Sequence, residues 1–113
     1  MLIDGTDISM VRGDNETIKV TMKKYDGTII PFVAGDTVTL SVKEHSRMTA
    51  YTFQKIVTGV TGDFATISIE PADTHNLEFK SYAYDIELKN SYNQIKTIIR
   101  SSKFEIAEEI TNG

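Results

Sequence analysis

The sequence predicts an all-β fold, and three observations lead to this prediction. Apolar and polar residues alternate with a period of two in several segments, as in half-buried strands that have one wet face. These segments are rich in Val, Ile, Thr and Tyr, which suit the pleated surface of a sheet. Turn signals separate them at fairly regular intervals. We therefore expect an immunoglobulin-like antiparallel β-sandwich of about seven to eight strands.

The expected strands follow one another along most of the chain. Eight segments qualify: 6–11, 16–24, 37–45, 51–58, 64–70, 80–90, 94–101 and 103–108. Four of them have a clear apolar face, which we expect to point into the core. These faces are Ile18, Val20 and Met22; Val38, Leu40 and Val42; Ala65, Ile67 and Ile69; and Tyr82, Tyr84, Ile86 and Leu88.

The connections between these segments carry turn-forming residues. Asp26-Gly27 is a hairpin signal, and Gly-Asp pairs precede the strands expected at 37–45 and 64–70. The segment 90–93 separates the strands expected at 80–90 and 94–101. One short helical turn is expected at 71–74, because Pro71 suits the first helical position.

The length and the composition predict a single globular domain spanning 1–113, with 109–113 frayed. There is no cysteine, which excludes disulfides, thiolate metal ligands and a cysteine nucleophile. The net charge of −4 disfavours binding to the phosphate backbone of nucleic acid. The longest apolar runs are far shorter than a membrane span, and the start MLIDGTD lacks the features of a signal peptide.

The tripeptide Arg12-Gly13-Asp14 is the one short motif with a known recognition meaning, that of an adhesion signal. Its position between two expected strands also suits a turn, with Gly13 supplying a permissive backbone and Asp14 capping it. A match of three residues arises often by chance. We therefore predict a structural turn here.

The residue pattern gives no positive indication of catalysis, so we predict a protein that is not an enzyme and has no cofactor or metal. His45 and His75 lie thirty residues apart without a supporting ligand pair, and we expect both to be solvated. Asp85 and Glu87 are expected on the outward face of their strand, also solvated, whereas a glycosidase needs a buried acid. The pair Glu108-Glu109 lies near the end of the chain. No serine has the local signature of a nucleophile.

Exposed aromatic residues on a β-sandwich can stack on sugars, which keeps a carbohydrate-binding role open. Tyr82 and Tyr84 share an apolar face and belong to the expected core. Tyr25 and Tyr92 fall in turns and remain available. The absence of tryptophan makes a carbohydrate platform less favoured. An exposed sheet edge that pairs with another subunit is an equally simple basis for function.

Motifs along nearly the whole chain resemble the N-terminal domain of the phage baseplate upper protein family. They are SMVRGD, then KKYDGTIIPFVAGDTVTLSVKE, then ISIEPADTHNLEFKSYAYDIEL, then KTIIRSSKFEIAEEIT. Related small β-sandwich proteins belong to the tails and baseplates of phages and prophages of Gram-positive bacteria. The matching positions are Gly35 to Thr39, Pro71 to Leu77, Tyr82 to Ile86 and Phe104 to Ile106. The corner before Tyr82 also resembles that of immunoglobulin-like folds, where a Tyr bonds back across a turn.

This resemblance implies a virion structural protein of the tail or baseplate, assembled in the bacterial cytoplasm. Its expected partners are other virion subunits, or further copies of itself in a symmetric ring. Neither nucleic acid nor membrane insertion is expected, and the sequence does not identify which residues make the contacts. The alternative is a module that binds carbohydrate or a cell surface. A small hydrolase with scattered carboxylates is a third and weaker hypothesis.

Overall fold

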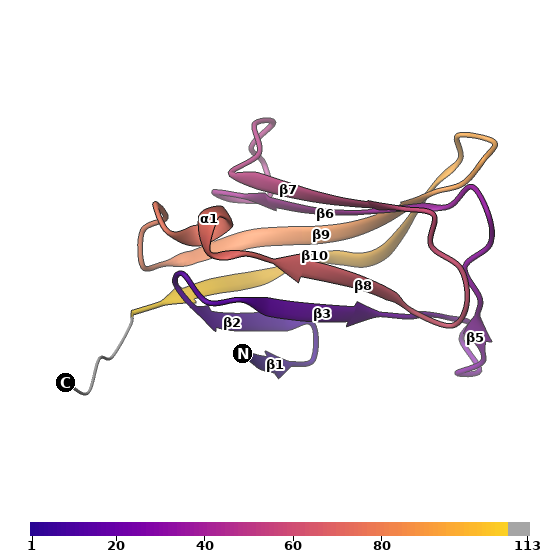
Figure 1. Ribbon diagram of the computed structural model, residues 1–113, viewed down its shortest axis with the longest axis horizontal. Helices are drawn as coiled ribbons and strands as arrows, with labels where there is room; N and C mark the ends of the chain where they lie inside the picture. The colour runs from indigo at the N-terminus through magenta and orange to yellow at the C-terminus, as the bar shows by residue number, and fades with distance from the viewer. Residues whose placement is uncertain (109–113) are drawn as a thin grey trace.

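The computed structural model describes residues 1–108, apart from the side chains of Leu2 and Asp4, and has two packed layers of β-strands (Figure 1). The all-β prediction is therefore confirmed, and the predicted fraying at 109–113 lies outside the described residues. The strands are β1 (Leu2–Asp4), β2 (Asp7–Val11), β3 (Glu16–Val20), β4 (Met22–Lys23), β5 (Ile29–Ile30), β6 (Thr37–Lys43), β7 (Phe53–Thr58), β8 (Ala65–Ile69), β9 (Ser81–Lys89) and β10 (Ile95–Ala107).

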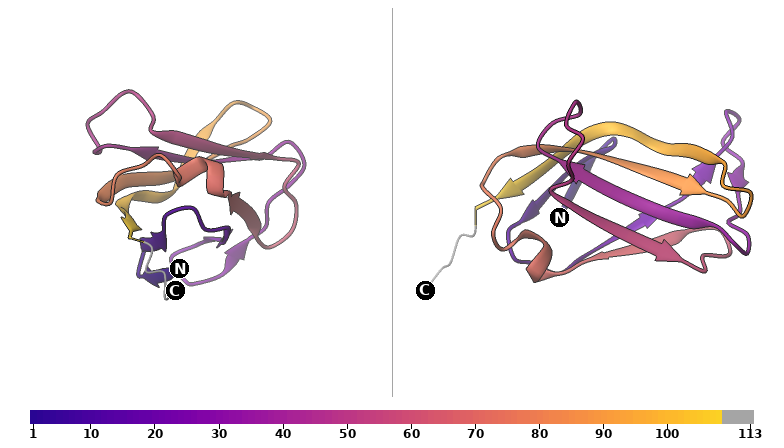
Figure 2. Two further views of the ribbon diagram at one scale, coloured as in Figure 1. Left: turned by 60° about the vertical axis from the view of Figure 1, so that its left-hand side comes forward. Right: turned by 90° about the horizontal axis from the view of Figure 1, so that it is seen from above.

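The larger layer is a six-stranded sheet in the order β1-β2-β10-β9-β6-β7. The smaller layer is the pair β3–β8, and β4 and β5 form a separate hairpin. The strands of both layers run along the length of the molecule, and the connecting loops gather at its ends (Figure 2). This layout suits the alternating pattern, since each strand buries one face against the opposite layer.

One strand pair departs from the predicted antiparallel arrangement. β2 runs parallel to β10, with Ile8 opposite Phe104 and Val11 opposite Ala107. The burial of β2 still alternates, so either direction would place the same side chains in the core. Alternation therefore specifies the buried face of a strand but carries no information about the direction of its neighbour.

Several strand boundaries also differ from the prediction. The segment 16–24 divides at Thr21 into two strands with different partners. β3 pairs with β8, whereas β4 pairs with β5 across the Asp26-Gly27 turn. The segments 94–101 and 103–108 form one long strand, β10, whose register against β9 shifts twice between Thr97 and Ser102. These shifts are bulges, which bend a strand without ending it. The short edge strand β1 was not expected.

The core lies between the two layers and contains every residue predicted to face inward. All of these side chains are buried, and Ile8, Met10, Phe32, Val60, Phe104 and Ile106 complete the cluster. Phe104 is fully buried, and its ring meets those of Phe53 and Tyr84 edge to face, with centroids 6.0 and 5.9 Å apart. Such edge contacts are a favoured geometry for aromatic rings.

The predicted helical turn is present as α1 (Pro71–Thr74), between β8 and β9. Pro71 begins it, and the backbone N–H of Glu70 donates to the Asp73 carboxylate at 2.8 Å. This bond closes the first turn, which a four-residue helix could not sustain alone. No helical segment within residues 1–108 has the length and apolar character needed to cross a membrane.

Candidate functional site

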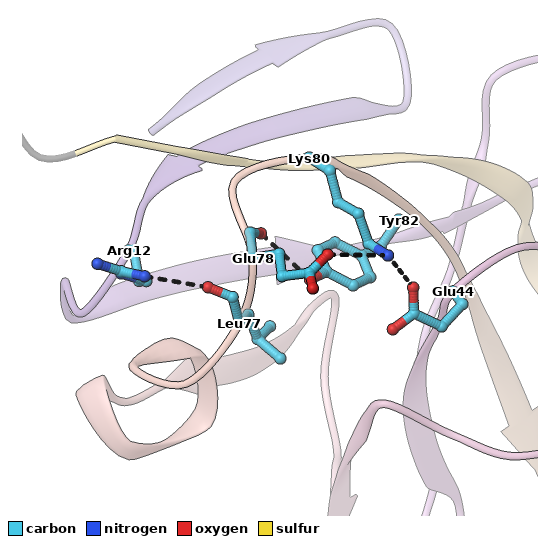
Figure 3. A network of polar contacts seen from close by, with 6 residues as sticks. All are labelled: Arg12, Glu44, Leu77, Glu78, Lys80 and Tyr82. Carbon is cyan, nitrogen blue, oxygen red and sulfur yellow. Dashed lines mark hydrogen bonds and ion pairs between the residues drawn. The ribbon is translucent and has the colours of Figure 1, made fainter.

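The Arg12-Gly13-Asp14 turn is built into the fold, as predicted, and its arginine reaches inward to the loop before β9. The Arg12 guanidinium donates to the carbonyl of Leu77 at 3.2 Å (Figure 3). It also lies over the Phe79 ring, 4.0 Å from its centroid. A cation on an aromatic face is held by electrostatic attraction as well as by packing. Arg12 therefore fastens the turn to a loop 65 residues away in sequence.

Gly13 connects the same turn to α1. Its φ is +83°, which favours glycine, and its N–H donates to the Thr74 hydroxyl at 2.9 Å. Thr74 has no exposed surface, so this bond satisfies a buried group. Asp14 closes the turn through its backbone, since its N–H donates to the carbonyl of Val11 at 3.2 Å. The bond that closes the turn is thus made by the backbone of Asp14, and not by its side chain as predicted.

The corner before β9 is closed by Tyr82. Its hydroxyl donates to the carbonyl of Glu78, four residues upstream, at 3.1 Å (Figure 3). Burial raises the pKa of Tyr82, so the hydroxyl keeps its proton for this bond. Lys80 pairs with Glu44 from the end of β6 and lies 3.6 Å from the Glu78 carboxylate. These contacts hold the corner and leave its polar groups engaged within the chain.

The two histidines lie apart and are both exposed. Nδ1 of His45 accepts from the N–H of Arg47 at 3.3 Å, and Nδ1 of His75 lies 3.0 Å from the carbonyl of Ala72. Each ring thus contacts only its own turn. Among the side chains that the structure describes, which leave out that of Asp4, no three His, Asp or Glu groups gather in the manner of a metal site.

A hollow of about 200 Å³ lies on the outer face of the six-stranded sheet, over β6 and β9. We call it the sheet hollow. Its lining includes Ser41 and Lys43 from β6, Asp85, Glu87 and Lys89 from β9, and Tyr51 and Gln54 on the side of β7. A smaller hollow of about 30 Å³ adjoins it and shares Ser41, Lys43 and Asp85.

The sheet hollow changes the interpretation of Asp85 and Glu87. Both face outward, as predicted, but they are half-buried rather than fully solvated. Asp85 lies opposite Ser41 of β6, and Glu87 lies between β6 and β10, so the flanking strands shield both carboxylates in a way that the pattern of a single strand does not reveal. The ion pairs formed within residues 1–108 involve neither these carboxylates nor Lys43 and Lys89. The hollow therefore offers charged groups of both signs that have no ionic partner in the described chain.

Tyr25 and Tyr92 both lie at the end of the molecule that carries the β4–β5 hairpin. Tyr25 is fully exposed and lines a wide, open hollow of about 700 Å³ with Lys23, Lys24 and Lys96. Tyr92 is 83% exposed in the β9–β10 turn and lines none of the hollows described above. The two residues predicted as a sugar platform thus have exposed rings, but only Tyr25 borders a recess.

The comparisons with known proteins return no relative on which to base a function. The chain matches no protein-family model, and no curated protein or solved structure is significantly similar to it.

Proposed function

We propose that this chain is a structural subunit of a phage or prophage tail or baseplate and acts through protein–protein contacts. The order of motifs along the sequence, from SMVRGD to KFEIAEEIT, supports this proposal. The structural feature that supports it most is the edge of β3, which pairs on one side with β8 and, in the described residues, with no strand on the other.

An immunoglobulin-like topology belongs to the same proposal. The neighbours β10-β9-β6-β7 follow the order of the G, F, C and C′ strands, and the β3–β8 pair corresponds to B and E. The bond from the Tyr82 hydroxyl to the carbonyl of Glu78 has the form of a tyrosine corner. Both features favour this topology over other sandwiches.

Sheet edges are the natural docking elements of a β-protein, and three of the four edges of the two main layers, those of β1, β7 and β8, are blunted. β1 has only three residues. β7 turns Lys55 inward, where its ammonium lies 3.0 Å from the Asp73 carboxylate of α1. That ion pair also bridges the two layers beside β8, since Asp73 belongs to the helix that follows β8. Short strands and inward charges are features that natural proteins use to prevent edge-to-edge pairing.

The edge of β3 has such a feature at its first residue, Glu16, whereas the rest of the strand is unprotected. Its only ladder partner in residues 1–108 is β8. It contains no proline or bulge. Its first residue, Glu16, is half-buried on the inward face and its carboxylate lies 2.9 Å from the amino group of Met1, but the next inward side chains, Ile18 and Val20, are apolar. A two-stranded layer is the smallest that can cover a core, and a third strand would extend it. A neighbouring subunit that adds a strand along β3 would gain main-chain hydrogen bonds without remodelling the fold.

The test is amide hydrogen exchange on the protein alone at rising concentration and on its mixtures with the proteins encoded by adjacent genes. We expect association, with new protection at 16–20, while 53–58 of β7 exchanges as before. A chain that stays monomeric and binds none of these proteins would refute the assembly role. Association that protects other segments instead would refute only the β3 edge.

A further inference from the structure

The sheet hollow has the size and the curvature of a small-ligand site. Its volume of about 200 Å³ is below the range of drug-sized pockets, which suits one compact ring or a short side chain. The adjoining hollow of about 30 Å³ extends it toward Ser101 of β10. Together they form a short groove across the middle of the outer face, in the layer that does not contain β3.

The polar groups of the sheet hollow are arranged so that several can still bond to a ligand. Ser41 is only 7% exposed, and its hydroxyl oxygen accepts from the Gln54 amide at 3.0 Å. That bond leaves the Ser41 proton to donate and the Gln54 carbonyl to accept. The half-buried carboxylates of Asp85 and Glu87 add further acceptors, and the ammonium groups of Lys43 and Lys89 add donors.

The charges of the sheet hollow favour a neutral ligand. Its two carboxylates and two ammonium groups sum to zero. An anionic ligand would gain from the lysines but lose against Asp85 and Glu87, and a cationic ligand would meet the reverse. Hydroxyl groups donate and accept at once, so a neutral polyol can engage both kinds of group.

The shape of this face argues against a second copy of the chain as the occupant. An isologous contact centred on the hollow would place one concave surface opposite another and leave an unfilled space, whereas stable interfaces are packed as densely as protein interiors. Tyr51, 53% exposed at the margin, instead provides an aromatic surface for the C–H face of a small ring. Lys43 lies 5.3 Å from the centre of the Tyr51 ring and steadies it.

We propose that the sheet hollow binds a neutral saccharide unit, with Asp85, Glu87, Ser41 and Gln54 bonding its hydroxyls and Tyr51 covering its apolar face. This site is distinct from the pair Tyr25 and Tyr92 that the sequence suggested. It is also independent of assembly through β3, because the two surfaces lie on different layers. The role is one of recognition and involves no bond-breaking step.

The test is titration of the isotopically labelled protein with glucose, galactose, rhamnose and N-acetylglucosamine, followed by NMR. We expect saturable shifts confined to the lining of the sheet hollow, with little change in affinity on adding salt because the ligand is neutral. Glucuronate, an acidic sugar of similar size, should bind more weakly than glucose.

Two variants locate the site. Tyr51→Ala and Asp85→Asn should each raise the Kd about tenfold or more, since the first removes the aromatic contact and the second replaces a charged acceptor by a weaker neutral one. Tyr92→Ala is the matched control and should leave the Kd unchanged. Unfolding curves show whether each variant is folded, and Glu87→Gln replaces Asp85→Asn if that protein is not.

Flat spectra with all four neutral sugars would overturn the proposal, as would shifts centred on Tyr25 or Tyr92. Equal loss of affinity in Tyr51→Ala and Tyr92→Ala would overturn it too. None of these results would affect the exchange experiment on β3, so failure of the sugar site and failure of the assembly role are separable.

Discussion

The two ends of the sandwich differ in the side-chain hydrogen bonds that stabilise each of them. At the corner end, with the Arg12–Asp14 turn and α1, the bonds of Arg12 and Gly13 join residues 65 and 61 positions apart. At the hairpin end, Asp26 and Asn90 accept from backbone groups only two to four residues away. The side-chain bonds of the corner end therefore join distant segments, whereas the Asp26 and Asn90 turns each close on themselves and the hairpin end is joined over a long range by the backbones of Phe32 and Gly62. Substitutions should cost more at the corner end.

The largest expected difference concerns Thr74. Thr74→Val removes a buried hydroxyl and leaves the half-buried N–H of Gly13 without its acceptor, which costs about 1–3 kcal/mol. Thr61→Val, at an exposed position of the hairpin end, should stay within about 0.5 kcal/mol of the parent. Urea unfolding of both variants measures the difference. Equal losses would show that the two ends are not distinct.

Arg12 should rank next and also tests the meaning of the tripeptide. Arg12→Ala loses the bond to Leu77 and the stack on Phe79, and about 1–2 kcal/mol of stability with them. Asp14→Ala should cost less, because the Asp14 side chain is exposed and the turn bond uses its backbone. Thermal unfolding compares the two. A larger loss in Asp14→Ala would contradict the structural role assigned to Arg12.

A smaller effect is expected at the tyrosine of the corner. Tyr82→Phe removes the bond to the carbonyl of Glu78 and should cost about 1 kcal/mol. Tyr25→Phe is the matched change at the hairpin end and should have no measurable effect, since the Tyr25 ring is fully exposed. Chemical denaturation of this pair of variants provides the comparison. A stable Tyr82→Phe would mean that packing alone closes the corner.

The last expected effect is a loss of stability in alkali that comes from ionisation of the Tyr84 hydroxyl, and it is absent at neutral pH. Burial raises the pKa of Tyr84 to about 12 from the ordinary value of 10.0, and its hydroxyl donates to the carbonyl of Thr6. As the pH rises, the unfolded chain loses this proton before the folded chain does. The contribution of Tyr84 to the free energy of unfolding is therefore fully present below pH 10 and declines as the pH rises toward 12. Stability curves of the parent and of Tyr84→Phe should converge over this interval. Parallel curves would show that Tyr84 is not the group responsible.

Local pattern predicted the strands and their buried faces because each depends on residues that are neighbours in sequence. Ile18, Leu40, Ile67 and Ile86 are buried as their alternation predicts. The same reasoning predicted the Asp26-Gly27 turn and α1, whose bonds are short in sequence. Local chemistry was a sufficient guide wherever the decisive contact was also local.

The features that the sequence did not predict depend on contacts between distant segments. Asp85 is half-buried between the strands that flank β9, where Ser41 of β6 lies opposite it, so the sheet hollow has no signature in β9 alone. The acceptor for Gly13 is a threonine in α1, and nothing near Gly13 indicates it. An outward acid that faces hydroxyl and amide residues on two neighbouring strands is the signal that could have revealed the hollow.

The parallel pairing of β2 with β10 has a consequence for how the chain acquires its structure. β10 lies between β2 and β9, so the large sheet cannot be completed until residues near 104 meet those near 8. Such a distant closure carries a large entropic cost before any contact repays it, which places folding in the slow range of milliseconds to seconds. On the ribosome, β2 must wait for nearly all of the described chain to be made, and until then one of its edges stays open to wrong partners.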